Sequence, residues 1–137
     1  MINSRPCAIL SRDDKGAWSL KDKVHGKLYS FSSHMLNENL NGTFLQDGWL
    51  NLRDGNLLLP LMSRASIALR GDHNVANVLA AFAIGHAAGF PPDPMIQAVK
   101  DFQGVPHRLE FVRELRGVCW YNDSIATAPE RSMAAIR

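Results

Sequence analysis

The chain has 137 residues, of which 46% are hydrophobic and 20% are charged, a composition typical of a globular protein and not of a disordered one. Its fifteen basic and thirteen acidic residues leave a formal charge of +2, and the basic residues form no block, which argues against nucleic acid as a partner. The N-terminus lacks the apolar core of a signal peptide, and no apolar stretch reaches the roughly 20 residues of a membrane span, so we expect a soluble cytoplasmic protein with no membrane partner.

The first half of the chain has the pattern of β-strands. The apolar run Cys7–Leu10 and the alternating segment Leu28–Ser32 predict two strands, the first of them buried. Farther on, Asp-Gly pairs separate short apolar segments, and they supply the positive φ that tight hairpins need. We therefore predict an antiparallel meander over residues 42–61, with Pro60 marking an edge strand or the exit from the sheet.

Two helices are predicted next along the chain. The first follows Gly71, with Asp72 expected as its N-cap and the Gly-Phe-Pro-Pro sequence at 89–92 as its stop signal. Its apolar residues recur at the spacing of one helix face and are Val75, Val78, Leu79, Phe82 and Ala83. The second helix is expected to begin with Asp93 as N-cap and Pro94 at the first helical position. The buried face predicted for it consists of Met95, Ile96, Val99 and Phe102.

The last part of the chain predicts two strands and a further helix. Leu109–Val112 alternates in hydropathy, and Val118–Tyr121 is continuously apolar, as in a fully buried strand of a parallel sheet. Cys119, like Cys7, lies in an apolar stretch and no Cys-x-x-Cys pair occurs, so we expect two free, buried thiols. Pro129 is expected to open the helix.

Three polar clusters occur where these elements begin or end, and the first is Gly71–Asn77 at a helix N-terminus. A helix start offers unpaired N–H groups and a partial positive charge, which suit anions or polar rings. Asn74 and Asn77 are three residues apart and share a helix face, and an Asn amide can match the paired donor and acceptor of an adenine edge. The alternative is a capped helix with two solvated amides.

The second cluster, Pro106–Glu110, follows a loop. Arg108 could stack on a base or bind a phosphate or a ribose, with His107 orienting it. The alternative is a surface ion pair between Arg108 and Glu110, since both residues lie on the same side of a strand.

The third cluster is Asn122–Ser124, followed by Thr127, directly after the apolar strand. Ligands of open α/β sheets gather at the carboxyl ends of strands, where an Asp commonly binds a ribose hydroxyl or a metal. The alternative is a strand-to-helix turn in which Asp123 and Ser124 satisfy local amides and Thr127 caps the next helix.

Several signatures of catalysis are absent from the sequence. It has no Gly-x-x-x-x-Gly-Lys-Ser/Thr phosphate loop, no Gly-x-Gly-x-x-Gly, no His-Glu-x-x-His and no Gly-x-Ser-x-Gly. Its five histidines are dispersed, and His86, on the first predicted helix, is interpreted as a packed histidine and not as a ligand. The sequence therefore predicts no catalytic residue and no metal ligand.

The three clusters, in this order and at this separation, resemble the Mur ligase family. The resemblance rests on Leu69–Ala81 (LRGDHNVANVLAA), Phe102–Glu110 (FQGVPHRLE) and Tyr121–Thr127 (YNDSIAT). Each string alone is a weak signal, whereas the three together are specific. The resemblance is strong from Leu69 to Arg137 and looser in the β-rich first half.

The resemblance implies an α/β fold and a segment of a longer enzyme. Mur ligases have a domain for the UDP-sugar, a central ATPase domain and a Rossmann-like domain for the incoming amino acid. Residues 1–116 would be the later part of the central domain, a β-meander plus helices, and residues 117–137 would be the first strand and helix of the amino-acid-binding domain. The full-length enzyme is expected to be a monomer.

The resemblance also implies the reaction. An ATP-dependent ligase of this kind, with Mg²⁺ held mostly by residues outside this chain, forms an acyl phosphate on UDP-N-acetylmuramoyl-L-alanine, which the amine of glutamate then attacks. Asn77 would contact adenine, Arg108 the base or ribose region, and Asp123 the ribose. His73 and Asn74 would shape the helix start beneath the nucleotide. Thr127 and Ser124 would lie near the glutamate or the muramoyl substrate.

One position departs from the family pattern. Ile125 stands where many members have Lys in Asn-Asp-Ser-Lys-Ala-Thr, so the cation of that lysine is missing here. Relatives that add L-glutamate resemble this chain at that position, which leaves the glutamate enantiomer open. Two further hypotheses are a folylpolyglutamate synthase-like ligase, against which the Tyr-Asn-Asp-Ser string argues, and a nucleotide-binding module without catalysis.

Overall fold

A computed structural model describes residues 6–127 and Met133. The chain divides into two compact units, Met1–Asp101 (unit 1) and Phe102–Arg137 (unit 2), and each is described by itself. The predicted helix from Pro129 lies outside the described residues apart from Met133. The predicted domain boundary after Arg116 does not coincide with the division after Asp101, and the assignment of domains of a longer enzyme stays a prediction.

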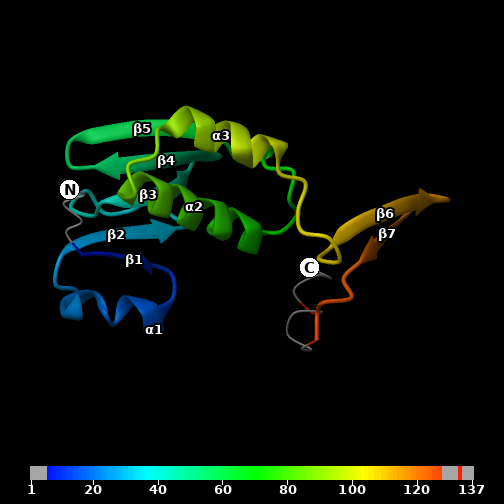
Figure 1. The fold of residues 1–137 in the computed structure, drawn as a ribbon, viewed down its shortest axis with the longest axis horizontal. Coiled ribbons are helices and arrows are strands. Elements are labelled where there is room, and N and C mark those ends of the chain that lie inside the picture. The colour runs from blue at the N-terminus through cyan, green and yellow to red at the C-terminus, as the bar shows by residue number, and fades with distance from the viewer. Residues whose placement is uncertain (1–5, 128–132, 134–137) are drawn as a thin grey trace. The chain divides into compact units, whose positions relative to one another are not determined.

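Unit 1 is built on a five-stranded mixed sheet with the strand order β1-β2-β3-β4-β5 (Figure 1). The strands are β1 (Cys7–Ser11), β2 (Lys27–Ser32), β3 (Gly42–Gln46), β4 (Trp49–Asp54) and β5 (Leu57–Ser63). β2 pairs in parallel with both β1 and β3, whereas β3, β4 and β5 form the predicted antiparallel meander. Pro60 lies on β5, which is an edge strand as predicted. A proline is tolerated there because an edge strand does not need every N–H for the hydrogen-bond ladder.

The β3–β4 turn shows why the Asp-Gly pairs mark the meander. Asp47 has a φ of 50° and Gly48 a φ of 76°. A two-residue hairpin of this type requires left-handed backbone at both positions, which glycine adopts without cost and aspartate adopts more readily than most residues. The turn therefore fixes the register in which Gln46 faces Trp49.

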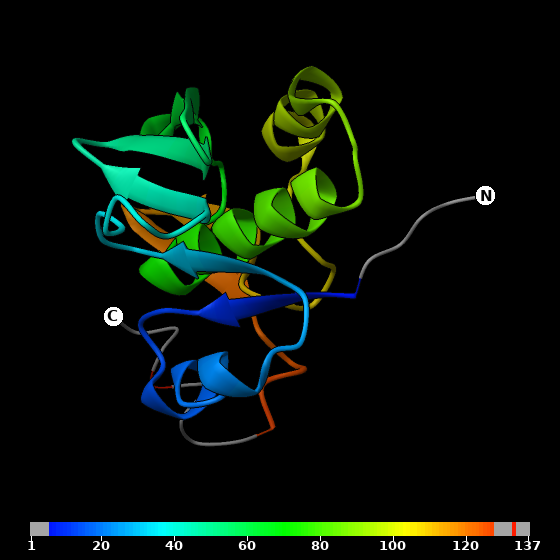
Figure 2. The ribbon, with the colours of Figure 1, turned by 90° about the vertical axis from the view of Figure 1, so that its left-hand side faces the viewer.

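The helices of unit 1 are α1 (Lys15–Trp18), α2 (Asp72–Ala87) and α3 (Pro92–Asp101), with short 3₁₀ turns η1 (Lys21–Lys23) and η2 (Arg64–Ser66). α2 packs against β1, β2, β3 and β4, and α3 packs against α2 and β5 (Figures 1 and 2). None of the helices in the described part of the chain is long and apolar enough to cross a membrane.

The core of unit 1 lies between α2 and the meander. The whole predicted apolar face of α2 is buried, and it meets strand residues such as Leu50 and Leu52. Thr43 adds a polar contact between β3 and α2, because its Oγ1 donates a hydrogen bond of 2.6 Å to the carbonyl of Leu79 in the buried interface. The partly buried residues of α3 that pack on this core are Met95, Ile96 and Val99.

The helix starts differ from the prediction. Asp72 is the first helical residue and Gly71 is the N-cap, so no side chain caps α2. α3 begins at Pro92, which takes the first helical position in place of Pro94, and Asp93 lies inside the first turn. The prediction was wrong because either proline has the φ that a first helical residue needs, and the earlier one extends the helix.

Phe102 was also wrongly predicted to be buried on α3. The helix ends at Asp101, and Phe102 lies beyond it with 45% of its surface exposed.

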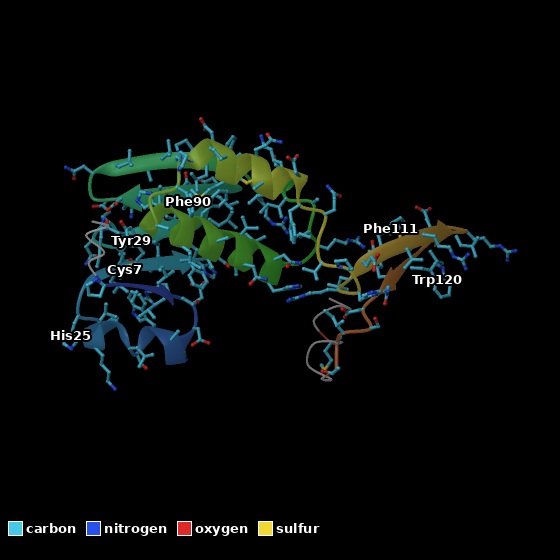
Figure 3. The ribbon with its side chains drawn as sticks, viewed as in Figure 1. Cys7, His25, Tyr29, Phe90, Phe111 and Trp120 are labelled. Atoms are coloured by element: carbon cyan, nitrogen blue, oxygen red, sulfur yellow. The ribbon has the colours of Figure 1, made fainter. Side chains whose placement is uncertain are left out.

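Unit 2 contains a two-stranded antiparallel hairpin, β6 (Glu110–Leu115) and β7 (Val118–Asn122). β7 was predicted to be a fully buried strand of a parallel sheet, and this is wrong in the structure. Its Val118 and Trp120 are more than half exposed, as is Phe111 on β6 (Figure 3). Hydropathy identifies the strand but not its partners, and no helix among the described residues of unit 2 covers either face.

Both cysteines are free, as predicted, but neither is buried. Cys7 and Cys119 are exposed. Cys7 begins the edge strand β1, and Cys119 lies on the uncovered hairpin.

Candidate functional site

The first polar cluster opens helix α2. Gly71 has a φ of 87°, and a Cβ atom there would lie 2.8 Å from the His73 ring. Glycine adopts this positive φ without strain, so the backbone turns sharply into the helix with the His73 ring close to the turn. The free N–H groups of this helix start have no capping side chain at the N-cap.

The two asparagines of this cluster are coupled. Asn74 Nδ2 donates a hydrogen bond of 2.6 Å to the carbonyl of Arg70, and Asn77 Nδ2 approaches Asn74 Oδ1 at 3.5 Å. Asn74 is half-buried and Asn77 is exposed. Asn74 therefore holds the turn before the helix, and Asn77 is the more exposed of the two amides.

The structure brings the second and third clusters together in unit 2. Asn122 Nδ2 lies 2.9 Å from His107 Nδ1 and 3.4 Å from Glu110 Oε2, and the N–H of Leu109 donates to Asp123 Oδ1 at 3.2 Å. The strand pairing of Glu110 with Asn122 places the two clusters at the same end of the hairpin. That the first cluster, in unit 1, joins them around one nucleotide stays a prediction.

Arg108 lies in a tight turn between these contacts. His107 has a φ of 65° and Leu109 a φ of 47°, so the residues on both sides of Arg108 are left-handed. The Glu110 carboxylate accepts the N–H of His107 at 2.8 Å. Within the described residues Glu110 forms its ion pair with His107, at 3.7 Å, and not with Arg108. The arginine is exposed.

The residues after Asp123 continue the turn. Ser124 donates its N–H to Asn122 Oδ1 at 3.2 Å, and Ala126 donates its N–H to the carbonyl of Asp123 at 3.0 Å. Ser124 and Thr127 are exposed. Ile125, the departure from the family pattern, has 43% of its surface exposed. Thr127 as the cap of the next helix stays a prediction, because that helix lies outside the described residues.

Sequence reasoning missed a fourth polar cluster, which lies in unit 1. Asp54 Oδ2 lies 2.8 Å from Tyr29 Oη, 2.9 Å from His86 Nε2 and 3.1 Å from Lys27 Nζ. These residues come from β4, β2 and α2, and the His86 ring also meets the Tyr29 ring edge-on at 5.5 Å. The interpretation of His86 as a packed histidine is confirmed. No spacing in the sequence relates Asp54 to His86, so the cluster could not have been found from motifs.

The surroundings of this cluster lower the pKa of Asp54 and raise the pKa values of Lys27 and Tyr29. Burial tends to raise the pKa of Asp54, but the hydrogen bonds from His86, Tyr29 and Lys27 outweigh it, so the pKa is lowered from 3.8. The pKa of Lys27 is raised by its contacts with Tyr29 and Asp54. Burial raises the pKa of Tyr29. The arrangement favours a charged carboxylate and a neutral phenol, as expected of an ion cluster that holds elements together.

The donor set gives no metal centre among the residues that the structure describes. No three or more His, Cys, Asp or Glu side chains there are placed to hold an ion. The amides, guanidinium and carboxylate of the three clusters have instead the chemistry that recognises a nucleoside: donors and acceptors for a base edge, a planar cation and an acceptor for hydroxyls.

Comparison with known proteins gives close relatives in sequence. The UDP-N-acetylmuramoylalanine–D-glutamate ligase of Thermoanaerobacter sp. (strain X514) is 36% identical over 129 residues, which are 94% of this chain and 28% of that enzyme. The ligase of the same name from Pseudomonas putida (strain KT2440) is 50% identical over 76 residues, 56% of this chain and 17% of that enzyme. The chain thus spans about 28% of the length of the first of these relatives. No protein-family model matches it.

Solved structures share the fold. MurF from Acinetobacter baumannii superimposes with a TM-score of 0.65 at 20% identity, over 93% of this chain and 28% of that chain. A UDP-N-acetylmuramoyl-L-alanyl-D-glutamate–2,6-diaminopimelate ligase gives a TM-score of 0.56 at 22% identity, over 79% of this chain and 23% of that chain. The resemblance to the Mur ligase family carried by the three strings is thereby confirmed: nearly the whole chain matches a segment of those enzymes.

Proposed function

We propose that this chain is a segment of an ATP-dependent ligase that adds glutamate to UDP-N-acetylmuramoyl-L-alanine in peptidoglycan synthesis, through an acyl phosphate. The observation that carries the proposal is the 36% identity to a D-glutamate ligase over 94% of the chain. This similarity includes the β-rich half, where the sequence strings gave only a loose resemblance. The parent enzyme would be a cytoplasmic monomer that uses Mg²⁺ held mostly by residues outside this chain.

The residues that we propose for nucleotide binding are Asn77 for adenine, Arg108 for the base or ribose region, and Asp123 for the ribose, with His73 and Asn74 shaping the start of α2. The local geometry of each group supports its proposed role. Asn77 and Arg108 are exposed. Asp123 accepts the N–H of Leu109 through Oδ1, and among the described residues this leaves its second oxygen for a hydroxyl. Thr127 and Ser124 are proposed to lie near the glutamate or the muramoyl substrate.

The coding DNA around this segment tests the proposal. We expect the open frame to extend upstream through a Gly-x-x-x-x-Gly-Lys-Ser/Thr loop, because that loop cradles the phosphates in a ligase of this kind. A start codon at Met1 with its own ribosome-binding site would contradict the proposal and favour a nucleotide-binding module without catalysis.

The protein encoded by the extended frame tests the residue roles. Asn77→Ala should raise the KM for ATP by about three- to tenfold, the loss of one hydrogen bond to a ligand. Asp123→Ala should raise it by at least as much, because it also removes the acceptor of the Leu109 N–H. Asn39→Ala, at an exposed loop position, is the matched control and should leave that KM unchanged. Assays with D- and L-glutamate in parallel decide the enantiomer. If the KM for ATP changes by the same factor in the control Asn39→Ala as in the other two variants, or in none of the three, the assigned contacts are refuted.

A further inference from the structure

The turn of unit 2 that carries Arg108 has a backbone that needs external support. Left-handed φ values at His107 and Leu109 cost free energy in residues with a Cβ, and Leu109 is the less tolerant of the two. Two such residues in three positions persist only where neighbouring groups hold them. Within the turn, the N–H of Arg108 donates to the carbonyl of Val105 at 3.1 Å. The groups that hold the two left-handed residues come from Glu110 on β6 and from Asp123 just after β7.

Each left-handed residue is held by a carboxylate. Glu110 Oε2 accepts the N–H of His107 at 2.8 Å, and Asp123 Oδ1 accepts the N–H of Leu109 at 3.2 Å. Hydrogen bonds from N–H groups to ionised acceptors are stronger than neutral ones. Arg108, between them, is thus fixed at its backbone on both sides while its side chain is exposed.

Asn122 joins the two supports. Its Nδ2 lies 2.9 Å from His107 Nδ1 and 3.4 Å from the same Glu110 oxygen, and its Oδ1 accepts the N–H of Ser124. The carbonyl of His107 is also reached by the N–H of Ile125, at 3.4 Å. One amide therefore connects the turn before β6 to the turn after β7.

We infer that Glu110 and Asn122 are positioning residues that lock the 106–109 turn, so that Arg108 is presented to the nucleotide in one conformation. The inference rests on the proposed contact of Arg108 with the nucleotide. Asp123 serves in both roles, with Oδ1 on the turn and its other oxygen toward the ribose. The lock lowers the entropy that a flexible turn would lose on binding.

The test uses the 137-residue chain labelled with ¹⁵N, with the exchange of the His107 and Leu109 amide protons with water and the affinity for ADP both measured by NMR. Glu110→Ala should accelerate exchange at His107 by about tenfold or more, and it should weaken ADP binding by about tenfold. Asn122→Ala should act in the same direction. Glu110→Gln should restore both properties, because its amide oxygen can still accept the N–H.

Glu114→Ala is the matched control, since Glu114 is an exposed glutamate on the same strand, and it should change neither property. The amide shifts of β6 and β7 report whether each variant keeps the hairpin. Unchanged exchange at His107 in Glu110→Ala would overturn the inference, as would a loss in Glu110→Gln equal to that in Glu110→Ala. Faster exchange with unchanged ADP affinity would also overturn it. If the unsubstituted chain binds no ADP, the proposed nucleotide contact fails for this chain, and exchange alone decides whether the lock exists.

Discussion

The side chain of Asp54 connects three elements of unit 1, namely β4, β2 and α2. Its Oδ2 is approached by donors from β2 and α2, and the phenol of Tyr29 that reaches it is buried. Because these strands and this helix are far apart in the sequence, the carboxylate fixes tertiary structure and not only the end of β4. Replacing the carboxylate by a neutral amide would remove the charge that these three partners share, and hydrogen bonds to charged groups contribute more than an exposed ion pair.

We expect Asp54→Asn to lower the free energy of unfolding by about 1–2 kcal/mol near neutral pH. The folded-state pKa of Asp54 lies below 3.8, so its contribution is present above that pH and is lost as the pH falls through the folded-state pKa. The difference between the unsubstituted chain and Asp54→Asn should therefore shrink as the pH falls below about 5 and through the folded-state pKa of Asp54. Urea denaturation followed by circular dichroism at several pH values measures it.

Asp47→Asn is the matched control for this substitution. Asp47 is exposed in the β3–β4 turn with a φ of 50°, a conformation that asparagine also tolerates. We expect the Asp47→Asn variant to have the same free energy of unfolding, with the same pH dependence, as the unsubstituted chain. An Asp54→Asn variant indistinguishable from Asp47→Asn would show that the cluster contributes nothing to stability.

At the scale of elements, helix α2 carries the core of unit 1. Phe82 is 1% exposed among the core residues of the sheet, and its truncation would leave a cavity that neighbouring side chains fill only in part. We expect Phe82→Ala to cost about 3–5 kcal/mol in the free energy of unfolding. Phe90→Ala, just after the same helix and 62% exposed in its native state, should change it by less than about 0.5 kcal/mol. Urea midpoints of the two variants compare them, and similar midpoints would contradict this placement of the core.

The elements of unit 1 could be predicted because local rules agree with the fold there. The apolar spacing from Val75 to Ala83 identified the buried face of α2, and Asp-Gly pairs identified the hairpins. The parallel pairing of β2 with β1 and β3 could not be predicted, because pairing partners depend on contacts across loops and not on hydropathy. Helix starts were off by one or two residues, since Gly71 replaces a side-chain cap at α2.

At the scale of the whole molecule, the sequence predicted which residues the candidate site would contain but not the contacts between them. The strings that gave the family also gave His107, Arg108 and Asp123 as candidates. The hydrogen bonds that join the two clusters, Asn122 to His107 and Leu109 to Asp123, depend on the pairing of β6 with β7, which the sequence left open. The error for β7 has a similar origin, because hydropathy does not show which elements cover a strand: Val118 and Trp120 are more than half exposed.

The small share of a relative's length that the chain spans bears on its expected behaviour in an activity assay. Phosphoryl transfer depends on a phosphate cradle and on metal ions that neutralise developing charge. The sequence has no Gly-x-x-x-x-Gly-Lys-Ser/Thr loop, and the described residues hold no group suited to a metal. We therefore expect the 137-residue chain, given ATP, Mg²⁺, UDP-N-acetylmuramoyl-L-alanine and either glutamate enantiomer, to release no phosphate and form no amide product above a protein-free blank. The full-length Thermoanaerobacter ligase, assayed at the same molarity with D-glutamate, provides the positive control. Product of the correct mass from the isolated chain would contradict the proposal that the catalytic machinery lies mostly outside it.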